Sequence, residues 1–409
     1  MNLKKYRSLL ENSVSLFSLK AIDLALNLWL IPFLILKVGL YNYGLYAFAM
    51  ALVLFFVNLL NYGFNLSTVR DLAKTKGNPQ QLQTIFNEVF SVKLVLFLFL
   101  TALFLVLTFW IPKFSNYKTL YLMSSLLLLG DLFSLRWFFM GLEKMKFIAL
   151  IHLVGTCVFV LLALRFVHKA EDYYKIPLFE AIGMFLTTLF SFAWVLKSYR
   201  FRLQLLPFKS VCRYLKENFS AFINLLLPST YGTGIVFLVG VFALPVHVSL
   251  MQIGVKFSGA FSTVNTVLTS VFYPLVNRNI TAMFSTRMVL LGMGFLLSLG
   301  MFIFSNFLIT SWLQFEEPSH LLQTVHLVKL LSPIPFLVAC ISSYGWNGLL
   351  PLYQDKLFGR ITAFASVVMI LAAILLVPLH SYLGGAAAFL LARMVHAGLS
   401  FYFFKKQHL

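Results

Sequence analysis

The stretch VKLVLFLFLTALFLVLTFWI at residues 92–111 holds one charged residue, Lys93, in an otherwise almost wholly apolar run. A helix that crosses a bilayer needs about 20 mostly apolar residues. Backbone groups in lipid must be bonded within a helix or a closed barrel, and strands of alternating polarity are absent. We therefore predict an all-α membrane protein with twelve spans: Val14–Leu36, Tyr43–Tyr62, Val92–Ile111, Leu120–Phe139, Phe147–Val167, Pro177–Leu196, Phe219–Phe242, Val248–Leu275, Met288–Trp312, Thr324–Trp346, Ile361–Val377 and Tyr382–Phe404.

The composition agrees with this class. Of 409 residues, 60% are hydrophobic and 11% are charged, whereas a soluble domain carries roughly a quarter charged residues. A water-soluble fold of this composition would expose far too much apolar surface. The composition therefore excludes an ordinary soluble protein.

Lysine and arginine predict the orientation of the spans, because cytoplasmic loops carry an excess of them. With the N-terminus inside, the cytoplasmic segments hold 22 of the 32 basic residues, Lys93 among them, and the external loops hold six. Both termini are then cytoplasmic. The net charge of +19 is explained by loops facing anionic lipid headgroups, and no nucleic-acid partner is expected.

The chain divides into two predicted lobes of six spans each. They cover residues 1–200 and 218–409, and a basic cytoplasmic linker covers residues 201–217. Arg70 and Arg278 follow corresponding spans 208 positions apart, and Trp137 and Trp346 close corresponding spans 209 positions apart. Because each half has an even number of spans, the repeat would be parallel, with a pseudo-two-fold axis along the membrane normal. Many transporters bind their substrate between such halves.

Three sequence motifs carry a family resemblance. They are LKVG at residues 36–39 with YGLY at 43–46, YGFNLSTVR at 62–70, and WFFMGLEKMK at 137–146. In this order and spacing they resemble the O-antigen-type oligosaccharide flippases of the polysaccharide biosynthesis family. That family belongs to the superfamily of the multidrug and toxin extrusion transporters and the lipid II flippases.

The resemblance implies two six-helix lobes around a central cavity. It also implies a flippase of the bacterial inner membrane, which moves an undecaprenyl-pyrophosphate-linked oligosaccharide from the cytoplasmic to the periplasmic leaflet by alternating access. Membrane lipids and the lipid-linked substrate would be its partners, and a polysaccharide polymerase or glycosyltransferases could work beside it.

Charges inside membrane spans are costly and mark candidate functional sites. We predict a substrate-binding role for Lys20 and Asp23, which share one helix face, and for Lys256 and Arg393. The cations would hold the pyrophosphate and Asp23 would orient or release it. Structural alternatives remain: Lys20 and Asp23 could form a local ion pair, Lys256 could extend to the external interface, and Arg393 could pair within its lobe.

Two further carboxylates are candidates for ion coupling. Asp131 lies within the fourth span, and Glu180 begins the sixth, where it could instead be an interface residue. A carboxylate buried in an apolar environment can take up a proton near neutral pH. Either residue could therefore load a proton or a sodium ion.

Two other function classes remain open. An ion-coupled multidrug or metabolite antiporter of the same superfamily is the main alternative, although the intramembrane cations favour an anionic substrate. A membrane-embedded sugar polymerase is less favoured because the external loops are short. The scattered histidines have no metal-ligand spacing, and no Walker-type phosphate loop occurs, so we expect no metal, no cofactor and no enzymatic activity.

Overall fold

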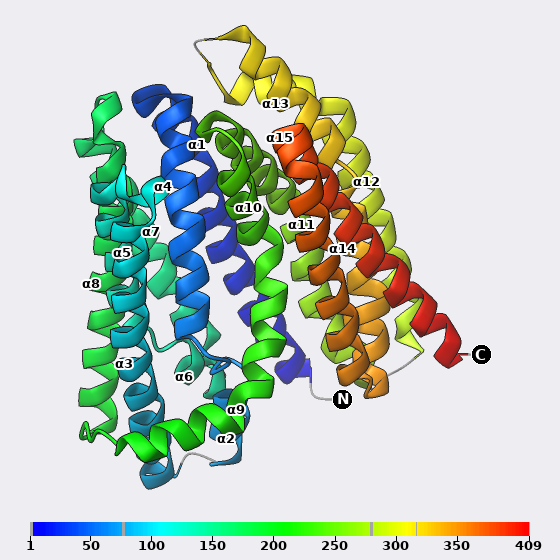
Figure 1. Ribbon diagram of the computed structural model, residues 1–409. Coiled ribbons are helices and arrows are strands. Elements are labelled where there is room, and N and C mark those ends of the chain that lie inside the picture. The colour runs from blue at the N-terminus through cyan, green and yellow to red at the C-terminus, as the bar shows by residue number, and fades with distance from the viewer. Residues whose placement is uncertain (1–2, 76–77, 279–280, 316, 409) are drawn as a thin grey trace. The chain divides into compact units, whose positions relative to one another are not determined.

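The computed structural model describes the backbone of residues 3–75, 78–278, 281–315 and 317–408. It describes the side chains of residues 21–75, 78–219, 221–223, 226, 231–273, 275–277, 281–315 and 317–407. Every regular element within these ranges is a helix (Figure 1). The chain forms two compact units, Met1–Val38 with Ala49–Ser229 and Gly39–Phe48 with Thr230–Leu409.

The first unit is a bundle of helices joined by short connections. Its elements are α1 (Leu3–Leu60, of which residues 39–48 belong to the second unit), α2 (Ser67–Lys74), α3 (Pro79–Trp110), α4 (Pro112–Ser115), α5 (Lys118–Leu132), α6 (Arg136–Gly141), α7 (Met145–Phe166), the 3₁₀-helix η1 (Ala170–Tyr174), α8 (Lys175–Tyr199) and α9 (Phe208–Ser229).

The aromatic motif on α6 forms the core of this unit at one end of the bundle. Trp137, Phe138 and Phe139 are at most 2% exposed and pack in one cluster with Phe64 and Leu72. A Cβ atom at Gly141 would lie 2.5 Å from Leu72 Cδ1. The glycine therefore permits α6 to pack closely against α2.

The motif that follows α1 holds α9 in place. The Tyr62 hydroxyl donates to the Leu215 carbonyl oxygen at 3.0 Å, and the Thr68 and Tyr214 hydroxyls are bonded at 2.8 Å. The Tyr62 ring also stacks on Phe222 with centroids 4.5 Å apart. In Figure 1 the first part of α9 lies across the ends of the other helices of this unit.

The second unit contains two π-helical stretches within its helices. Its elements are the π-helix η2 (Thr230–Gly234), α10 (Ile235–Phe242), α11 (Pro245–Arg278), α12 (Ala282–Trp312), α13 (Pro318–Leu331), α14 (Ile334–Cys340), the π-helix η3 (Ile341–Leu349), the 3₁₀-helix η4 (Leu350–Leu352) and α15 (Asp355–His408). The stretch η2 lies where Pro228, Gly232 and Gly234 interrupt the predicted seventh span. π-Helical turns are rare and often mark functional positions.

Two long helices are broken inside. Gly39 (φ 79°) interrupts α1 and Ser381 (φ 50°) interrupts α15. Beyond the break in α15, Gly384 lies against the Leu376 carbonyl oxygen, so the chain folds back on itself at this point. Both breaks fall in gaps between predicted spans, at residues 37–42 and 378–381.

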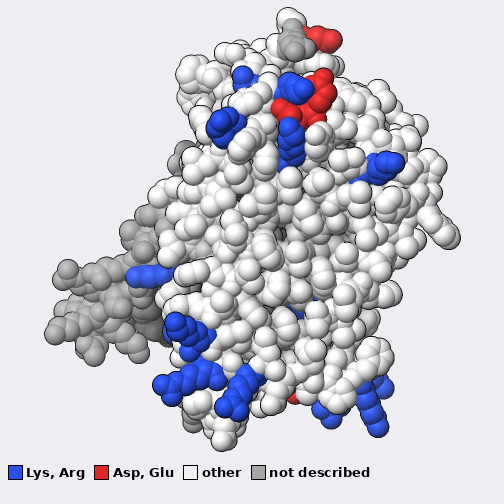
Figure 2. All heavy atoms as spheres, turned by 90° about the vertical axis from the view of Figure 1, so that its left-hand side faces the viewer, with Lys and Arg blue, Asp and Glu red and all other residues white. Residues whose placement is uncertain are grey.

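Eight helical stretches of the described chain are long and apolar enough to cross a membrane. Two of them, Ala21–Leu60 and Asp355–Gln407, have 40 and 53 residues. At 1.5 Å per residue each would be about twice as long as the roughly 30 Å hydrocarbon core, or longer, and each contains one of the two breaks. Figure 2 shows that most charged side chains on one face of the molecule gather at its two ends and leave a broad uncharged band between them. The prediction of an all-α, multi-pass membrane protein is confirmed.

The compact units do not divide the chain where the lobes were predicted to divide. Residues 201–217 and helix α9 belong to the first unit, and residues 39–48 belong to the second. The contacts of Tyr62 and Thr68 with α9 are the physical reason why the basic segment packs with the first unit. The arrangement of two six-helix lobes stays a prediction.

Candidate functional site

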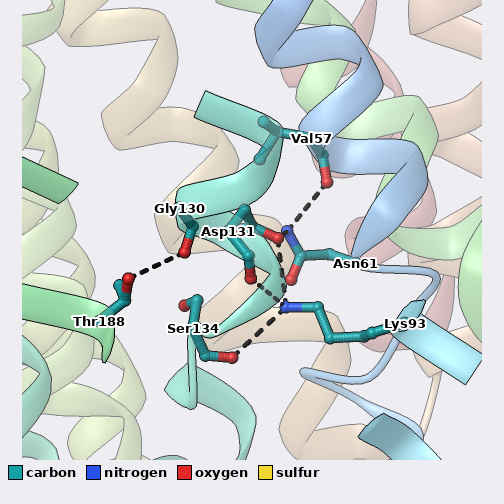
Figure 3. Close-up of polar contacts among 7 residues, drawn as sticks. All are labelled: Val57, Asn61, Lys93, Gly130, Asp131, Ser134 and Thr188. Atoms are coloured by element: carbon teal, nitrogen blue, oxygen red, sulfur yellow. Dashed lines mark hydrogen bonds and ion pairs between the residues drawn. The ribbon is translucent and has the colours of Figure 1, made fainter. Parts of the chain in front are cut away.

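Asp131 is buried in the first unit and is paired with a lysine from another helix (Figure 3). Its Oδ2 lies 3.2 Å from the Nζ of Lys93, and the two side chains are 7% and 2% exposed. Asn61 at the end of α1 donates from Nδ2 to the same Oδ2 at 3.0 Å. The three side chains therefore join α1, α3 and α5.

The lysine ammonium has further acceptors in this cluster. It donates to the carbonyl oxygens of Asp131 at 2.6 Å and Ser134 at 3.3 Å, where α5 ends. Burying two charges costs free energy that only close pairing and additional hydrogen bonds offset. The cluster meets these conditions, so its evident role is to fix three helices relative to one another within the unit.

Lys93 corrects one step of the sequence analysis. It was counted among the cytoplasmic basic residues, yet its side chain is buried beside Asp131. The physical reason is that a carboxylate 38 residues later in the chain offsets the cost of its burial. Hydropathy does not reveal such a partner.

Asp23 on α1 forms a second polar cluster with α7. The Nδ1 of His152 lies 3.0 Å from Asp23 Oδ1, and the Thr156 hydroxyl donates to the same oxygen at 2.5 Å. The His152 side chain is 69% exposed and that of Asp23 is 22% exposed. Unlike the Lys93–Asp131 pair, this pair can be reached from outside the unit. The side chain of Lys20, its predicted neighbour, lies outside the described residues.

Glu180 is half-buried on α8. Its charge and that of Arg136 both act on the imidazole of His152. The structure thus brings Asp23 and Glu180 into one electrostatic neighbourhood of the first unit, whereas Asp131 lies in the separate cluster with Lys93.

Arg393 on α15 lies among aromatic side chains of the second unit. Its guanidinium carbon is 4.4 Å from the Tyr231 ring centre and 5.4 Å from that of Phe389. Its Nε is buried without a hydrogen-bond partner, and no carboxylate of the described residues pairs with it. A membrane-embedded guanidinium held by rings alone retains its capacity to bind an anion.

Two buried side chains complete the surroundings of Arg393. Tyr231 and His396 are each 4% exposed. The Tyr231 hydroxyl and the Nδ1 of His396 lie 3.4 Å apart, and the His396 Nε2 lies 3.3 Å from the Thr362 hydroxyl. Tyr231 lies in the π-helix η2, so the irregular turn of the backbone and the cation belong to one site.

Lys256 lies on α11 and its side chain is exposed. It forms no ion pair with any residue whose side chain the structure describes. Lys256 and Arg393 thus supply two cations without carboxylate partners to the second unit. In the part of the chain that is described, no group of three or more His, Cys, Asp or Glu side chains is placed to hold a metal ion.

The sequence analysis missed several members of these clusters. The residues not predicted as site residues are Lys93, Asn61, His152, Thr156, Tyr231 and His396. One signal was available: His152 lies five residues into the predicted fifth span, where a polar side chain needs a partner. The identity of that partner, 129 residues earlier in the chain, could not be known from the pattern.

Residues 9–280 match the family described as polysaccharide biosynthesis protein. The chain is 24% identical over 418 residues to the "Putative O-antigen transporter" of Escherichia coli (strain K12), covering 100% of this chain and 99% of that protein. A protein of the same name from Shigella dysenteriae is 27% identical over 208 residues, covering 50% and 52%.

Two solved structures share the fold. The lipid II flippase MurJ in an inward closed conformation has a TM-score of 0.76 at 15% identity, covering 96% of this chain and 87% of that chain. A multidrug resistance MATE family transporter of the MOP superfamily, inward-facing, has a TM-score of 0.69 at 14% identity, covering 97% and 98%. The family match extends over well over half of the sequence, and the chain therefore belongs to the polysaccharide biosynthesis protein family.

Proposed function

We propose that the chain is a flippase, not an enzyme, that moves an undecaprenyl-pyrophosphate-linked oligosaccharide from the cytoplasmic to the periplasmic leaflet of the bacterial inner membrane by alternating access. Twelve spans in two six-helix lobes, with both termini in the cytoplasm, are part of this proposal. The full-length similarity to a relative named as an O-antigen transporter supports it, and so does the fold shared with a lipid II flippase.

Arg393 is the observation that carries the proposal. A guanidinium within a membrane span is costly, and an unneutralised one needs an anion at some stage of the working cycle. The pyrophosphate of a lipid carrier supplies two negative groups and several acceptor oxygens. Charge-assisted hydrogen bonds to such a group are stronger in a low-dielectric site than in water. Lys256 would add a second cation, and Lys20 remains a predicted third.

Asp23 replaces the predicted Asp131 as the first candidate for ion coupling in this proposal. Lys93 neutralises Asp131 in a buried cluster, which makes Asp131 a poor carrier of a transported ion. Asp23 is accessible and pairs with His152, and histidine changes its charge near physiological pH. We propose that the Asp23–His152 pair exchanges the proton, with Glu180 as the second candidate.

The same pair is the feature that favours the alternative function, an ion-coupled multidrug or metabolite antiporter. The fold shared with a multidrug resistance transporter is compatible with it. Lys256 and Arg393, both cations without a described carboxylate partner, favour an anionic lipid instead. A polymerase or glycosyltransferases remain proposed partners, because a flipped oligosaccharide must be made and then consumed.

Complementation tests the proposal. The gene is deleted in its host, and wild type, Arg393→Gln or Arg393→Lys is expressed at matched membrane levels. We expect Arg393→Gln to abolish surface polysaccharide and to trap the lipid-linked precursor in the inner leaflet, while Arg393→Lys retains part of the transport. Arg165→Gln is the matched control, because Arg165 also lies over an aromatic ring, Phe166, at 5.4 Å, but near the end of α7. Unchanged surface sugar with altered drug tolerance would instead support the antiporter.

A further inference from the structure

Helix α11 presents a polar face to its surroundings. Its described exposed residues are Lys256, Gly259, Thr266, Ser270, Leu275 and Asn277. All except Leu275 fall on one stripe with Thr263 and Tyr273, spaced by alternating steps of three and four residues. At 3.6 residues per turn this spacing keeps them on one side of the helix. We call this stripe of seven residues, from Lys256 to Asn277, the α11 polar face.

The neighbouring helix α12 shows the opposite pattern. Between residues 288 and 304 every exposed residue of α12 is apolar or glycine: Met288, Val289, Gly292, Phe295, Leu296, Leu299, Phe302, Ile303 and Phe304. Such a surface suits lipid tails, whereas polar side chains in lipid are unfavourable. Two packed helices of one unit therefore present surfaces of opposite polarity, of which that of α12 suits lipid tails and that of α11 suits water.

The hydroxyl groups of the α11 polar face are arranged as acceptors. Thr263 donates to the Gly259 carbonyl oxygen at 2.9 Å, Thr266 to that of Ser262 at 3.2 Å, and Ser270 to that of Thr266 at 3.0 Å. Each hydroxyl thus uses its hydrogen within the helix and turns its oxygen lone pairs outward. Such oxygens accept hydrogen bonds from the hydroxyl groups of a ligand.

The length of the face indicates a path. Lys256 and Asn277 are 21 residues apart, which is about 30 Å of helix at 1.5 Å per residue. This is about the thickness of the hydrocarbon core. Gly259 adds room beside Lys256, because a Cβ atom placed there would meet no atom within 4 Å.

We propose that the α11 polar face is the track along which the carbohydrate part of the substrate crosses the membrane, with Lys256 attracting its phosphate groups. The inference rests on the proposed flippase function and specifies what the second unit contributes to it. Repeated weak acceptors suit a sugar chain, whose many hydroxyls can exchange bonds from one residue to the next. A hydrophobic drug would find few apolar contacts on this face.

The first test measures water access. Cys157, Cys212 and Cys340 are replaced by serine, and single cysteines are introduced as Gly259→Cys and Gly292→Cys. The two glycines are a matched pair, since a Cβ atom meets nothing within 4 Å at either one. We expect a membrane-impermeant maleimide to label Gly259→Cys but not Gly292→Cys, and purified lipid-linked precursor to slow the labelling. Equal labelling at both positions, or none at either, would overturn the proposal.

The second test separates the sugar from the lipid. Transport is measured for the host's full lipid-linked oligosaccharide and for the same lipid pyrophosphate carrying one sugar. We expect the triple variant Thr263→Val, Thr266→Val, Ser270→Ala to lower transport of the oligosaccharide about tenfold, equivalent to about 1.4 kcal/mol, and to change the short substrate little. The variant Thr310→Val, Ser311→Ala is the control, because these exposed hydroxyls on α12 also donate within their own helix.

The outcomes distinguish the two proposals. If the wild-type protein moves neither lipid, the flippase function is refuted, and the proposal that the α11 polar face is a carbohydrate track is refuted as well. If the wild-type protein moves both lipids and the triple variant does the same at wild-type rates, the flippase function stands and the track is refuted. A Gly259→Trp variant should also block the long substrate, while Gly292→Trp should not.

Discussion

The ammonium of Lys93 and the carboxylate of Asp131 lie 3.2 Å apart in the interior of the first unit, and neither side chain is more than 7% exposed. Asn61 bonds the same carboxylate oxygen. The pair connects helices that are distant in sequence, and each charge depends on the other. Loss of one partner leaves an uncompensated buried charge.

Lys93→Met should therefore destabilise the protein strongly. We expect a loss of about 3–5 kcal/mol, the usual result of breaking a buried ion pair. The double variant Lys93→Met, Asp131→Asn should recover most of it, because no unpaired charge remains. Thermal unfolding in detergent measures both. Lys144→Met, which removes an exposed ammonium bonded to Tyr199, should change stability by no more than about 0.5 kcal/mol.

The double variant also decides the role of Asp131 in transport. If it folds and transports at the wild-type rate, Asp131 carries no coupling ion. A folded double variant without transport would indicate that Asp131 takes part in ion coupling. It would contradict our proposal that Asp23 and His152 exchange the coupling proton.

Gly63 and Gly39 share a φ of +79° but differ in their surroundings. A Cβ atom at Gly63 would lie 2.7 Å from the Phe222 nitrogen, whereas one at Gly39 meets nothing within 4 Å. Gly39, with φ 79° and ψ 160°, lies in a region that almost only glycine adopts, so Gly39→Ala should cost only this conformational strain, about 1–3 kcal/mol. Gly63→Ala should cost more and loosen α9. Thermal unfolding and protease sensitivity of the 201–217 segment measure this; equal effects of the two changes would refute it.

The sequence was most informative about elements that depend on composition alone. Residues 92–110 of the apolar run lie in α3, and the breaks at Gly39 and Ser381 fall between predicted spans. Within the aromatic motif at residues 137–146, Trp137 and Phe138 are core residues. These features depend on hydrophobicity and local backbone geometry, which neighbouring residues in the sequence determine.

Side-chain pairings between different helices could not be predicted from the sequence in this way. A single lysine near the end of an apolar run has the same pattern whether it reaches the interface or a buried carboxylate. Lys93 contacts the buried carboxylate of Asp131, and His152 contacts Asp23 on another helix. Which face of α11 lacks a protein neighbour likewise depends on packing, although its three-and-four spacing was present in the sequence.

Asp172 at η1 provides a pH-dependent contribution to stability. Burial alone would raise the pKa of Asp172, but hydrogen bonds from the Lys175 side chain and the backbone N–H groups of His168 and Lys169 lower that pKa to about 2. Because the folded-state pKa is depressed, the contribution is present above the unfolded-state pKa of about 3.9 and is lost as the pH falls towards 2. The carboxylate therefore stabilises the N-terminal end of α8 at neutral pH.

Asp172→Asn should accordingly unfold at a lower temperature than wild type at pH 7. The difference between the two proteins should shrink as the pH falls below about 4. Unfolding midpoints measured from pH 3 to 7 test this. Glu171→Gln is the control, because the Glu171 side chain is 73% exposed and its contact with Lys169 is long, 3.9 Å. A gap that stayed constant with pH would exclude a role for the Asp172 charge.

The Asp23–His152 pair should give transport its pH dependence. The two groups lie on α1 and α7, 3.0 Å apart, and histidine is the side chain whose ordinary charge change falls between about pH 5 and 8. His152→Asn retains a donor for Asp23 but does not titrate in this range. We therefore expect transport by the wild-type protein to vary with pH and that by His152→Asn to vary little. Precursor flipping into vesicles of set internal and external pH measures this.

Other charged groups near the pair must be separated from it. Arg136 and Glu180 also act on the imidazole, and arginine stays protonated in proteins whereas a carboxyl group can exchange a proton. Glu180→Gln should displace the pH profile of transport without flattening it, because the titrating pair remains. His168→Asn, a change at an exposed histidine bonded to the Arg165 carbonyl, should leave the profile unchanged. If Glu180→Gln alone flattens the profile, the coupling proton belongs to Glu180, and Asp23 with His152 is a structural bridge between α1 and α7.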